Sequence, residues 1–233
     1  MISKLTTVNN PKQLTFPWSK PNKSTFKNFY FDNKNFPLKD SLKGNDDLFL
    51  YGINQCGKSY LLQAVCNFYA LQNKSSLYVP IKDLIDEGAS LIESLEYLDV
   101  ICIDDIDLIA SEREWELGLF NLINNCMISK CRLIFSSSLN PSKIYFTLQD
   151  LSSRLKKIDH IELFPISDNE LTDALKFICK SRSINLSDRE INYLITYSKR
   201  SISDLLFIID KLDKYSMESK RKITIPLIKE IID

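Results

Sequence analysis

One eight-residue motif constrains the fold of this chain more than any other feature. Residues 52–59 read Gly-Ile-Asn-Gln-Cys-Gly-Lys-Ser, the complete G-x-x-x-x-G-K-S pattern, between an apolar run at 48–51 and a helical pattern at 60–71. A strand, a glycine-containing turn and a helix in this order form a P-loop, whose backbone N–H groups and helix N-terminus point at phosphate. The expected nucleotide-binding residues of this segment are Gly52, Ile53, Asn54, Gln55, Cys56, Gly57, Lys58, Ser59 and Tyr60.

Two residues of the loop have individual roles in this interpretation. Lys58 is expected to place its charge against the β and γ phosphates of ADP or ATP, and the hydroxyl of Ser59 is expected to reach Mg²⁺. The motif therefore predicts a nucleotide site that also holds a magnesium ion.

Short apolar runs alternate with helical patterns through the first two thirds of the chain. This alternation predicts βαβ units, and hence an α/β fold with a mainly parallel five-stranded sheet. The expected strands are 48–51, 77–79, 100–103, 133–135 and 161–163, and the expected helices between them are 60–71, 84–97 and 112–128.

Beyond residue 163 the pattern becomes wholly helical. Two capping boxes, one serine cap and one first-turn proline mark four helix starts: Ser167 with Glu170, Ser187 with Glu190, Ser201, and Pro226. We therefore expect three segments, namely an N-terminal tail at 1–24, a nucleotide-binding α/β domain at 25–164 and a small helical lid domain at 165–233.

Polar side chains close two of the expected strands. Asp104 and Asp105 follow the apolar run at 100–103, and Ser136, Ser137 and Ser138 follow the run at 133–135. Because ligands of open α/β sheets bind at the carboxyl ends of the strands, Asp104 is the candidate partner of Mg²⁺ and Asp105 could orient an attacking water. Ser136 and Ser138 are candidates for contact with the γ phosphate, and the sequence does not decide between them.

Composition excludes several other classes of protein. Lys plus Arg and Asp plus Glu are balanced at 30 each, so no overall charge draws the chain to nucleic acid. No apolar run is long enough to cross a bilayer or to act as a secretory signal, so we expect a cytoplasmic protein without a membrane partner. The six cysteines form no C-x-x-C pair, and neither disulfides nor a zinc site is expected.

The order of these motifs resembles the AAA+ ATPases, and within them the DnaA-related family of replication proteins. The segments that carry the resemblance are 25–30, 102–109, 150–155 and 221–231. The likeness is closest to the short inactivator branch of this family, Hda. Two features favour that branch over an initiator: no helix-turn-helix segment follows the lid, and residues 81–99 leave room for one helix only.

The resemblance implies roles for further residues. Arg154 would be the arginine finger, acting in trans on the γ phosphate held by a neighbouring subunit, and Phe26, Phe29 and Tyr30 would shape the adenine pocket. Ser203 stands where the family carries a lid arginine against the nucleotide. That departure leaves both the discrimination between ADP and ATP and the intrinsic rate of hydrolysis undecided.

The tail contains a peptide that looks like the segment by which bacterial proteins dock on the sliding clamp, the β subunit of DNA polymerase III. Apolar side chains around a proline supply anchors, and the glutamine amide can pair with backbone groups. The residues concerned are Gln13, Leu14, Phe16, Pro17 and Trp18.

These features together predict a negative regulator of DNA replication initiation. Bound to the clamp, and to DNA only through it, the protein would stimulate hydrolysis of DnaA-bound ATP, and its own ATPase activity would be weak. Two alternatives remain, an ATP-hydrolysing helicase loader or remodelling protein, and an adaptor that binds nucleotide without an active arginine finger. Self-association as a homodimer and direct contact with DNA stay open.

Overall fold

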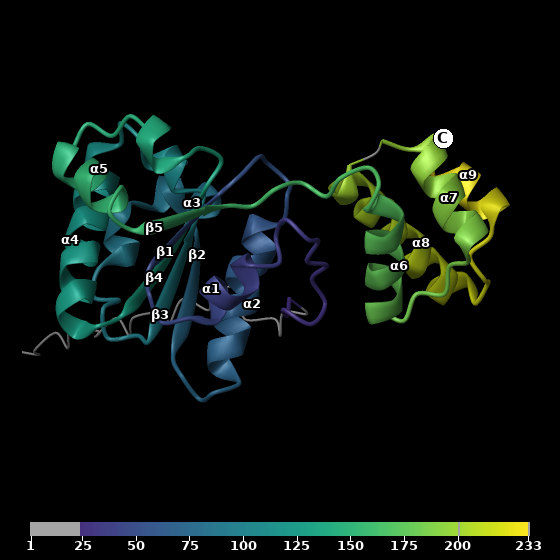
Figure 1. Ribbon diagram of the computed structural model, residues 1–233, viewed down its shortest axis with the longest axis horizontal. Helices are drawn as coiled ribbons and strands as arrows, with labels where there is room; N and C mark the ends of the chain where they lie inside the picture. Colours follow the sequence, from purple (N-terminus) through teal and green to yellow (C-terminus); the bar gives the residue numbers. More distant parts are fainter. Residues whose placement is uncertain (1–23, 200, 233) are drawn as a thin grey trace, which may run out of the picture.

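The computed structural model describes residues 24–199 and 201–232, which form a sheet domain and a helical domain side by side (Figure 1). Every strand pairing in the sheet is parallel, and the strand order is β2-β3-β4-β1-β5. The predicted α/β class and five-stranded sheet are thus confirmed. The strands are β1 (Leu48–Tyr51), β2 (Ser76–Pro80), β3 (Val100–Asp104), β4 (Arg132–Ser137) and β5 (Asp159–Glu162).

Helices cover both faces of this sheet. On one face lie α1 (Leu38–Lys43) and α2 (Lys58–Ala70), and on the other lies α4 (Arg113–Ser129) with α5 (Gln149–Leu155) beside it (Figure 1). Side chains of one strand alternate between the two resulting cores, so that Leu50 packs with α1 and α2 whereas Phe49 packs with α4. Strands buried on both faces read as continuous apolar runs, which is why the sequence predicts them well.

The predicted helix at 84–97 is wrong. That segment contains a short helix α3 (Ile81–Leu84) and two 3₁₀ turns, η1 (Ile85–Glu87) and η2 (Ala89–Ile92). Gly88 and Ser94 have φ angles of 92° and 58°, which end helical geometry at both positions. The apolar residues of the segment up to Leu95 still pack against the sheet domain's core, so most of the hydrophobic pattern is satisfied without a continuous helix.

Helix α1 has no counterpart in the sequence prediction, and a distant arginine supports its end. Arg132, at the start of β4, is 4% exposed. Its guanidinium donates to the backbone oxygens of Ser41 at 2.8 Å, Leu42 at 2.9 Å and Asp46 at 2.7 Å. The last carbonyls of a helix lack partners within it, so Arg132 supplies donors that α1 cannot provide itself.

The helical domain contains α6 (Leu171–Ser181), α7 (Asp188–Tyr197), α8 (Ile202–Ser219) and α9 (Ile225–Ile232) around an apolar core of its own. The predicted capping box of Ser187 and Glu190 is present, and Pro226 lies in the first turn of α9. The box predicted at Ser167 is wrong: α6 begins only at Leu171, and the Ser167 hydroxyl donates to the Glu170 carboxylate at 3.0 Å. Ser201 occupies the N-cap of α8, but its side chain makes no capping hydrogen bond.

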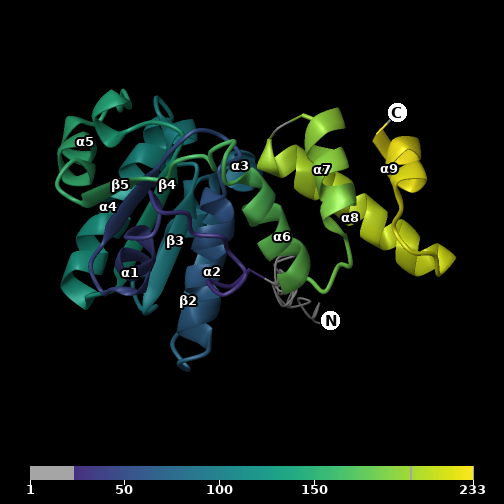
Figure 2. The ribbon, with the colours of Figure 1, turned by 45° about the vertical axis from the view of Figure 1, so that its right-hand side comes forward.

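The two domains meet at the P-loop, where residues of α6 and α8 lie opposite residues 28–30 and 55–57 (Figure 2). Asn35 fixes the connecting segment, because its amide nitrogen donates to the Phe164 oxygen and its amide oxygen accepts from the Phe164 nitrogen, both at 2.9 Å. The boundary predicted at 164 and 165 remains a prediction. Over the described part of the chain, no helix combines the length and apolar character needed to cross a membrane.

Candidate functional site

The loop between β1 and α2 needs glycine at both of its motif positions. A Cβ on Gly52 would lie 2.4 Å from the backbone oxygen of Leu163. Gly57 has a φ of 106°, and a Cβ there would lie 2.9 Å from the ring of Phe29. The P-loop pattern therefore reflects close packing at one glycine and a left-handed backbone at the other.

Lys58 is held inside this loop. Its side chain is 5% exposed, and its Nζ donates to the backbone oxygens of Gly52 at 2.8 Å and Ile53 at 3.0 Å. An ammonium group fixed in this way concentrates positive charge where the loop's backbone N–H groups converge. The arrangement suits an anion with several phosphate oxygens.

Asp104 ends β3 beside the loop and is hydrogen-bonded on both carboxylate oxygens. Ser136 of β4 donates its hydroxyl to Oδ1, and Tyr78 of β2 donates its hydroxyl to Oδ2 at 2.6 Å. Asp104 is 3% exposed. Neither Ser136 nor Asp104 lines the cleft described below. Ser136 therefore positions Asp104, whereas Ser138 lines the cleft.

Asp105 follows in a left-handed conformation with a φ of 58°, and its backbone N–H donates to the Ser136 hydroxyl at 3.0 Å. Burial raises the pKa of the Asp105 carboxyl, and the charge of Asp104 raises it further, while Lys58 opposes both effects. A carboxyl with a raised pKa beside a cleft has the character expected of a proton acceptor.

A cleft of about 540 Å³ brings the loop together with the carboxyl ends of β3 and β4. Ser138 faces it, donating its hydroxyl to the carboxylate of Asp107. Lys82 and Asp107 were not among the predicted residues, although they lie two and three positions after the ends of β2 and β3, where ligands of such sheets bind. The lining residues are Asn54, Gln55, Gly57, Lys58, Ser59, Lys82, Asp105, Asp107, Leu108, Ser138 and Ser203.

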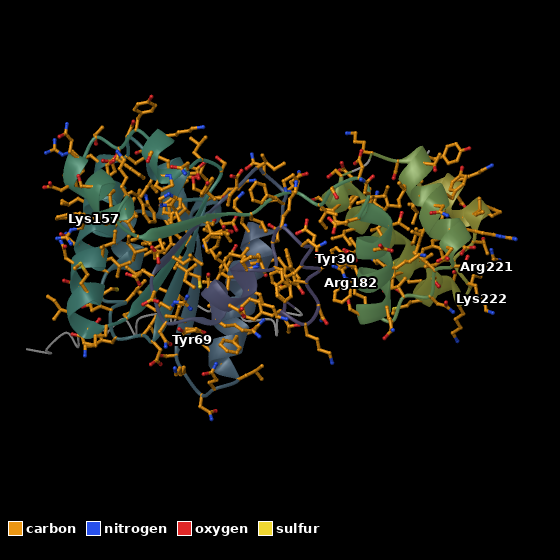
Figure 3. All side chains as sticks on the ribbon, in the orientation of Figure 1. Tyr30, Tyr69, Lys157, Arg182, Arg221 and Lys222 are labelled. Carbon is orange, nitrogen blue, oxygen red and sulfur yellow. The ribbon has the colours of Figure 1, made fainter. Side chains whose placement is uncertain are left out.

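A narrower slot of about 110 Å³ lies between the domains. Figure 3 shows Tyr30 of the sheet domain next to Arg182 of the helical domain at this junction. Phe26 does not line the slot; it is 8% exposed and packs against Phe68 with ring centres 5.8 Å apart, so it belongs to the core. The slot is lined by Asn28, Phe29, Tyr30, Gln55, Cys56, Gly57, Tyr60, Ile166, Ile178, Arg182, Ile202, Ser203 and Leu206.

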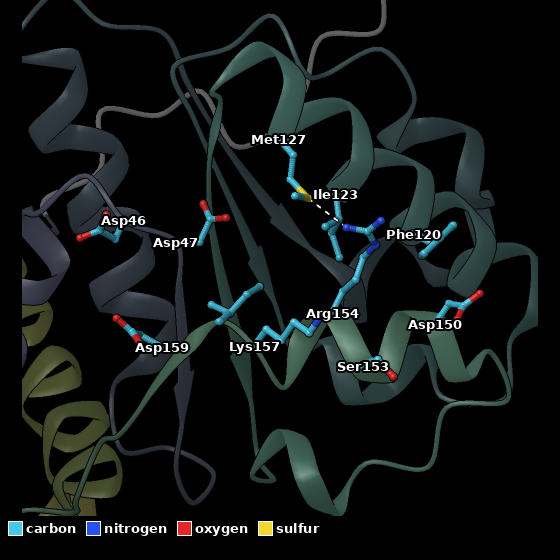
Figure 4. A pocket seen from close by; sticks show the side chains of 11 residues that line it. Asp46, Asp47, Phe120, Ile123, Met127, Asp150, Ser153, Arg154, Lys157 and Asp159 are labelled. Carbon is cyan, nitrogen blue, oxygen red and sulfur yellow. Dashed lines mark hydrogen bonds between the residues drawn. The ribbon is translucent and has the colours of Figure 1, made fainter.

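Arg154 lies elsewhere, on α5 in a groove of about 730 Å³ shared with α4 (Figure 4). Its Nη1 contacts the sulfur of Met127 at 3.0 Å, and its guanidinium stands 5.3 Å from the centre of the Phe120 ring. No residue of this groove lines the phosphate cleft or the slot. Arg154 therefore does not face the chain's own P-loop.

The donor set at the cleft fits Mg²⁺. Magnesium prefers oxygen ligands, and in nucleotide sites it uses one or two protein groups together with phosphates and waters. Ser59 lines the cleft and Asp104 is buried just behind Asp105, and both can supply such groups. Residues 24–199 and 201–232 contain no cluster of three or more His, Cys, Asp or Glu that could hold a metal alone. The predicted tail peptide, Gln13 to Trp18, lies outside the described residues.

Comparison of the sequence with known protein families assigns this chain to one of them. The sequence pattern of the bacterial DnaA ATPase domain matches residues 39–159, which contain the P-loop, Asp104 and Arg154. The chain belongs to the DnaA-related AAA+ family. The pattern of the Hda lid domain matches residues 168–232, so this family member is Hda-like in its helical domain, as the sequence predicts.

Relatives and solved structures agree with this assignment. A protein of Haemophilus influenzae, described as uncharacterized, is 33% identical over 229 residues, covering 95% of this chain and 99% of its own length. Domain III of Thermotoga maritima DnaA superposes with a TM-score of 0.75 at 21% identity, covering 89% of this chain and 95% of that one. AMPPCP-bound DnaA of Aquifex aeolicus gives 0.69 at 18% identity, over 84% and 66%. These two solved structures have the same AAA+ fold as this chain.

Proposed function

We propose that this protein binds ADP or ATP with Mg²⁺ and regulates DNA replication initiation by stimulating the hydrolysis of DnaA-bound ATP. The observation that carries the proposal is the position of Arg154, half-buried in a surface groove on α5 and outside the chain's own phosphate cleft. An arginine so placed can serve a nucleotide held by another subunit. Nucleotide bound at the P-loop would then stabilise the active conformation of this protein.

Nucleotide binding is supported by the geometry of the phosphate cleft and of the slot between the domains. The cleft offers Lys58 and the loop's N–H groups to phosphate, and the slot offers the aromatic rings of Phe29 and Tyr30 to a base. Among structures of the same fold, DnaA of Aquifex aeolicus was solved with AMPPCP, a nucleotide analogue. Bound magnesium would neutralise phosphate charge, and Ser59 and Asp104 would hold it.

The arginine finger is supported by the chemistry of the groove around Arg154. A guanidinium stabilises the charge that grows on the γ phosphate during hydrolysis, and such fingers contribute roughly 10³- to 10⁵-fold to the rate. In this protein the guanidinium contacts an aromatic ring and a thioether. Neither contact neutralises its charge, so Arg154 remains available to a phosphate presented by DnaA.

We also propose that Gln13, Leu14, Phe16, Pro17 and Trp18 attach the protein to the sliding clamp. A protein attached in this way would reach DNA indirectly and would work in the cytoplasm. Attachment would raise the local concentration of the finger near DnaA on the same DNA, as for any linked pair of binding modules.

One observation favours a second function, in which the protein hydrolyses its own ATP as a helicase loader or remodelling protein. Asp105 lines the phosphate cleft with a raised pKa and lies next to Asp104, so it can accept a proton from an attacking water. The two functions differ in whose ATP is consumed.

The experiment compares ATP hydrolysis by DnaA alone, by this protein alone and by the mixture, each with and without the clamp loaded on DNA. The proposal predicts slow turnover by this protein alone and faster loss of DnaA-bound ATP in the mixture with clamp. A variant with Gln13→Ala and Phe16→Ala should no longer show the acceleration that the loaded clamp gives to the wild type. Rapid turnover without DnaA, combined with no effect on DnaA, would establish the loader function instead.

A further inference from the structure

One tyrosine hydroxyl joins the two residues that would hold magnesium. Tyr78 lies in β2, and β2 pairs with β3 so that Tyr78 is opposite Cys102, two positions before Asp104. The hydroxyl of Tyr78 donates to Asp104 Oδ2 at 2.6 Å, and the side chains of Ser59 and Gln63 lie within hydrogen-bonding reach of it. The same hydroxyl therefore contacts both the P-loop helix and the acidic strand.

This contact and that of Ser136 fix the plane of the Asp104 carboxylate. Tyr78 holds Oδ2 and Ser136 holds Oδ1, in a side chain that is only 3% exposed. A carboxylate offers about four lone-pair positions, so two such bonds leave acceptor positions free for an ion or for its water. Residues that orient a metal ligand in this way typically change metal affinity about 10- to 100-fold when they are removed.

We propose that Tyr78 is a positioning residue for Mg²⁺, setting Asp104 relative to Ser59 before the ion arrives. The inference rests on the proposed nucleotide binding and adds a residue to that site. Because the carboxylate oxygens of Asp104 are already oriented, the side chain loses less conformational freedom when the ion binds. Less of the binding free energy is then offset by ordering the carboxylate. Neither the P-loop motif nor the acidic strand end points to β2 as a part of this site.

The test is a magnesium titration at a fixed concentration of a fluorescent ADP analogue, following the gain in nucleotide affinity. Tyr78→Phe removes one oxygen atom and keeps the ring. We expect the midpoint of the Mg²⁺ titration to rise about tenfold or more, while ADP affinity in EDTA stays unchanged. Tyr69→Phe is the matched control, because Tyr69 lies at the opposite end of α2 and its hydroxyl contacts Arg132 (Figure 3).

Each outcome of the titration either supports or contradicts the role of Tyr78. An unchanged midpoint in Tyr78→Phe overturns the inference, and a lowered midpoint does so too, since it would mean that the hydroxyl competes with the ion. Wild-type protein that binds ADP without any response to Mg²⁺ contradicts this inference alone. Wild-type protein that binds no nucleotide contradicts the proposed function and the inference with it. If Tyr78→Phe fails to fold, Ser136→Ala loosens the same carboxylate, and an unchanged midpoint there is the contradicting result.

Discussion

Ser203 of the helical domain donates its hydroxyl to the backbone oxygen of Gln55 in the P-loop, at 2.9 Å. The two residues are 148 positions apart, and both line the phosphate cleft. The contact brings the first turn of α8 directly against the loop that would hold phosphate. It also places Ser203 where a longer, charged side chain would reach the same cleft.

The first prediction concerns this position. Ser203→Arg introduces a guanidinium at the cleft, and a charge-assisted hydrogen bond to the γ phosphate should raise the preference for ATP over ADP about 10- to 100-fold, because such bonds contribute roughly 1.5–3 kcal/mol. Equilibrium binding of both nucleotides measures the ratio. Ser203→Ala, which removes the hydroxyl without adding charge, should leave the ratio unchanged. Equal ratios in all three proteins would show that Ser203 does not face the γ phosphate.

A second prediction concerns Glu116, a carboxylate that is 1% exposed on α4. It accepts from the backbone N–H groups of Ser111 at 2.8 Å, Thr147 at 3.0 Å and Leu148 at 2.7 Å, and from the Thr147 hydroxyl at 2.7 Å. The last two residues directly precede α5, which carries Arg154. Glu116→Gln turns part of this acceptor into a donor and should lower the free energy of unfolding by about 1–3 kcal/mol. Chemical denaturation measures the loss, and Glu114→Gln, exposed on the same helix, should change little.

The same residue predicts a dependence on pH. Burial alone would raise the pKa of Glu116, but its hydrogen bonds from Thr147, Leu148 and Ser111 outweigh burial and lower it below the ordinary value of 4.5. A lowered pKa in the folded state stabilises the protein above the unfolded pKa, and this contribution is lost as pH falls through the folded value. The stability difference between wild type and Glu116→Gln should therefore be full at pH 7 and shrink as pH falls below the ordinary value of 4.5. A difference that grows on acidification would contradict this.

A third site of prediction is Gly52. A Cβ there would lie 2.4 Å from the Leu163 oxygen, which belongs to the segment leading to the helical domain. Gly52→Ala should destabilise the fold by about 1–3 kcal/mol, the usual cost of overpacking, and should weaken ADP binding. Thermal unfolding and ADP titration report the two effects. Gly118→Ala, within α4, meets mainly side chains and should stay within about 1 kcal/mol of wild type.

The sequence predicts the strands and the P-loop because both depend on local patterns. Apolar runs such as 100–103 are buried on both faces, and the left-handed φ at Gly57 is a local property that glycine supplies. The helix predicted at 84–97 fails because φ angles at Gly88 and Ser94 interrupt it, and an apolar pattern does not report backbone angles.

Long-range contacts explain what the sequence leaves out of the site. Tyr78 enters it only because β2 lies beside β3, and Arg132 supports α1 from 90 positions away. The sequence also leaves Ser136 and Ser138 equivalent, whereas the structure directs one to Asp104 and the other to Asp107. These assignments need the strand order, which no motif in this chain specifies.

The most direct test of the proposed function is single-turnover hydrolysis of DnaA-bound ATP, with clamp loaded on DNA and with ADP, comparing wild type, Arg154→Ala and Lys157→Ala. Lys157 lies in the same groove and carries the same charge, so it controls for a general electrostatic effect (Figure 4). The proposal predicts that wild type and Lys157→Ala accelerate hydrolysis and that Arg154→Ala loses the acceleration by roughly 10³-fold or more. Equal acceleration by Arg154→Ala, or none by wild type, would contradict the arginine finger and with it the proposed function.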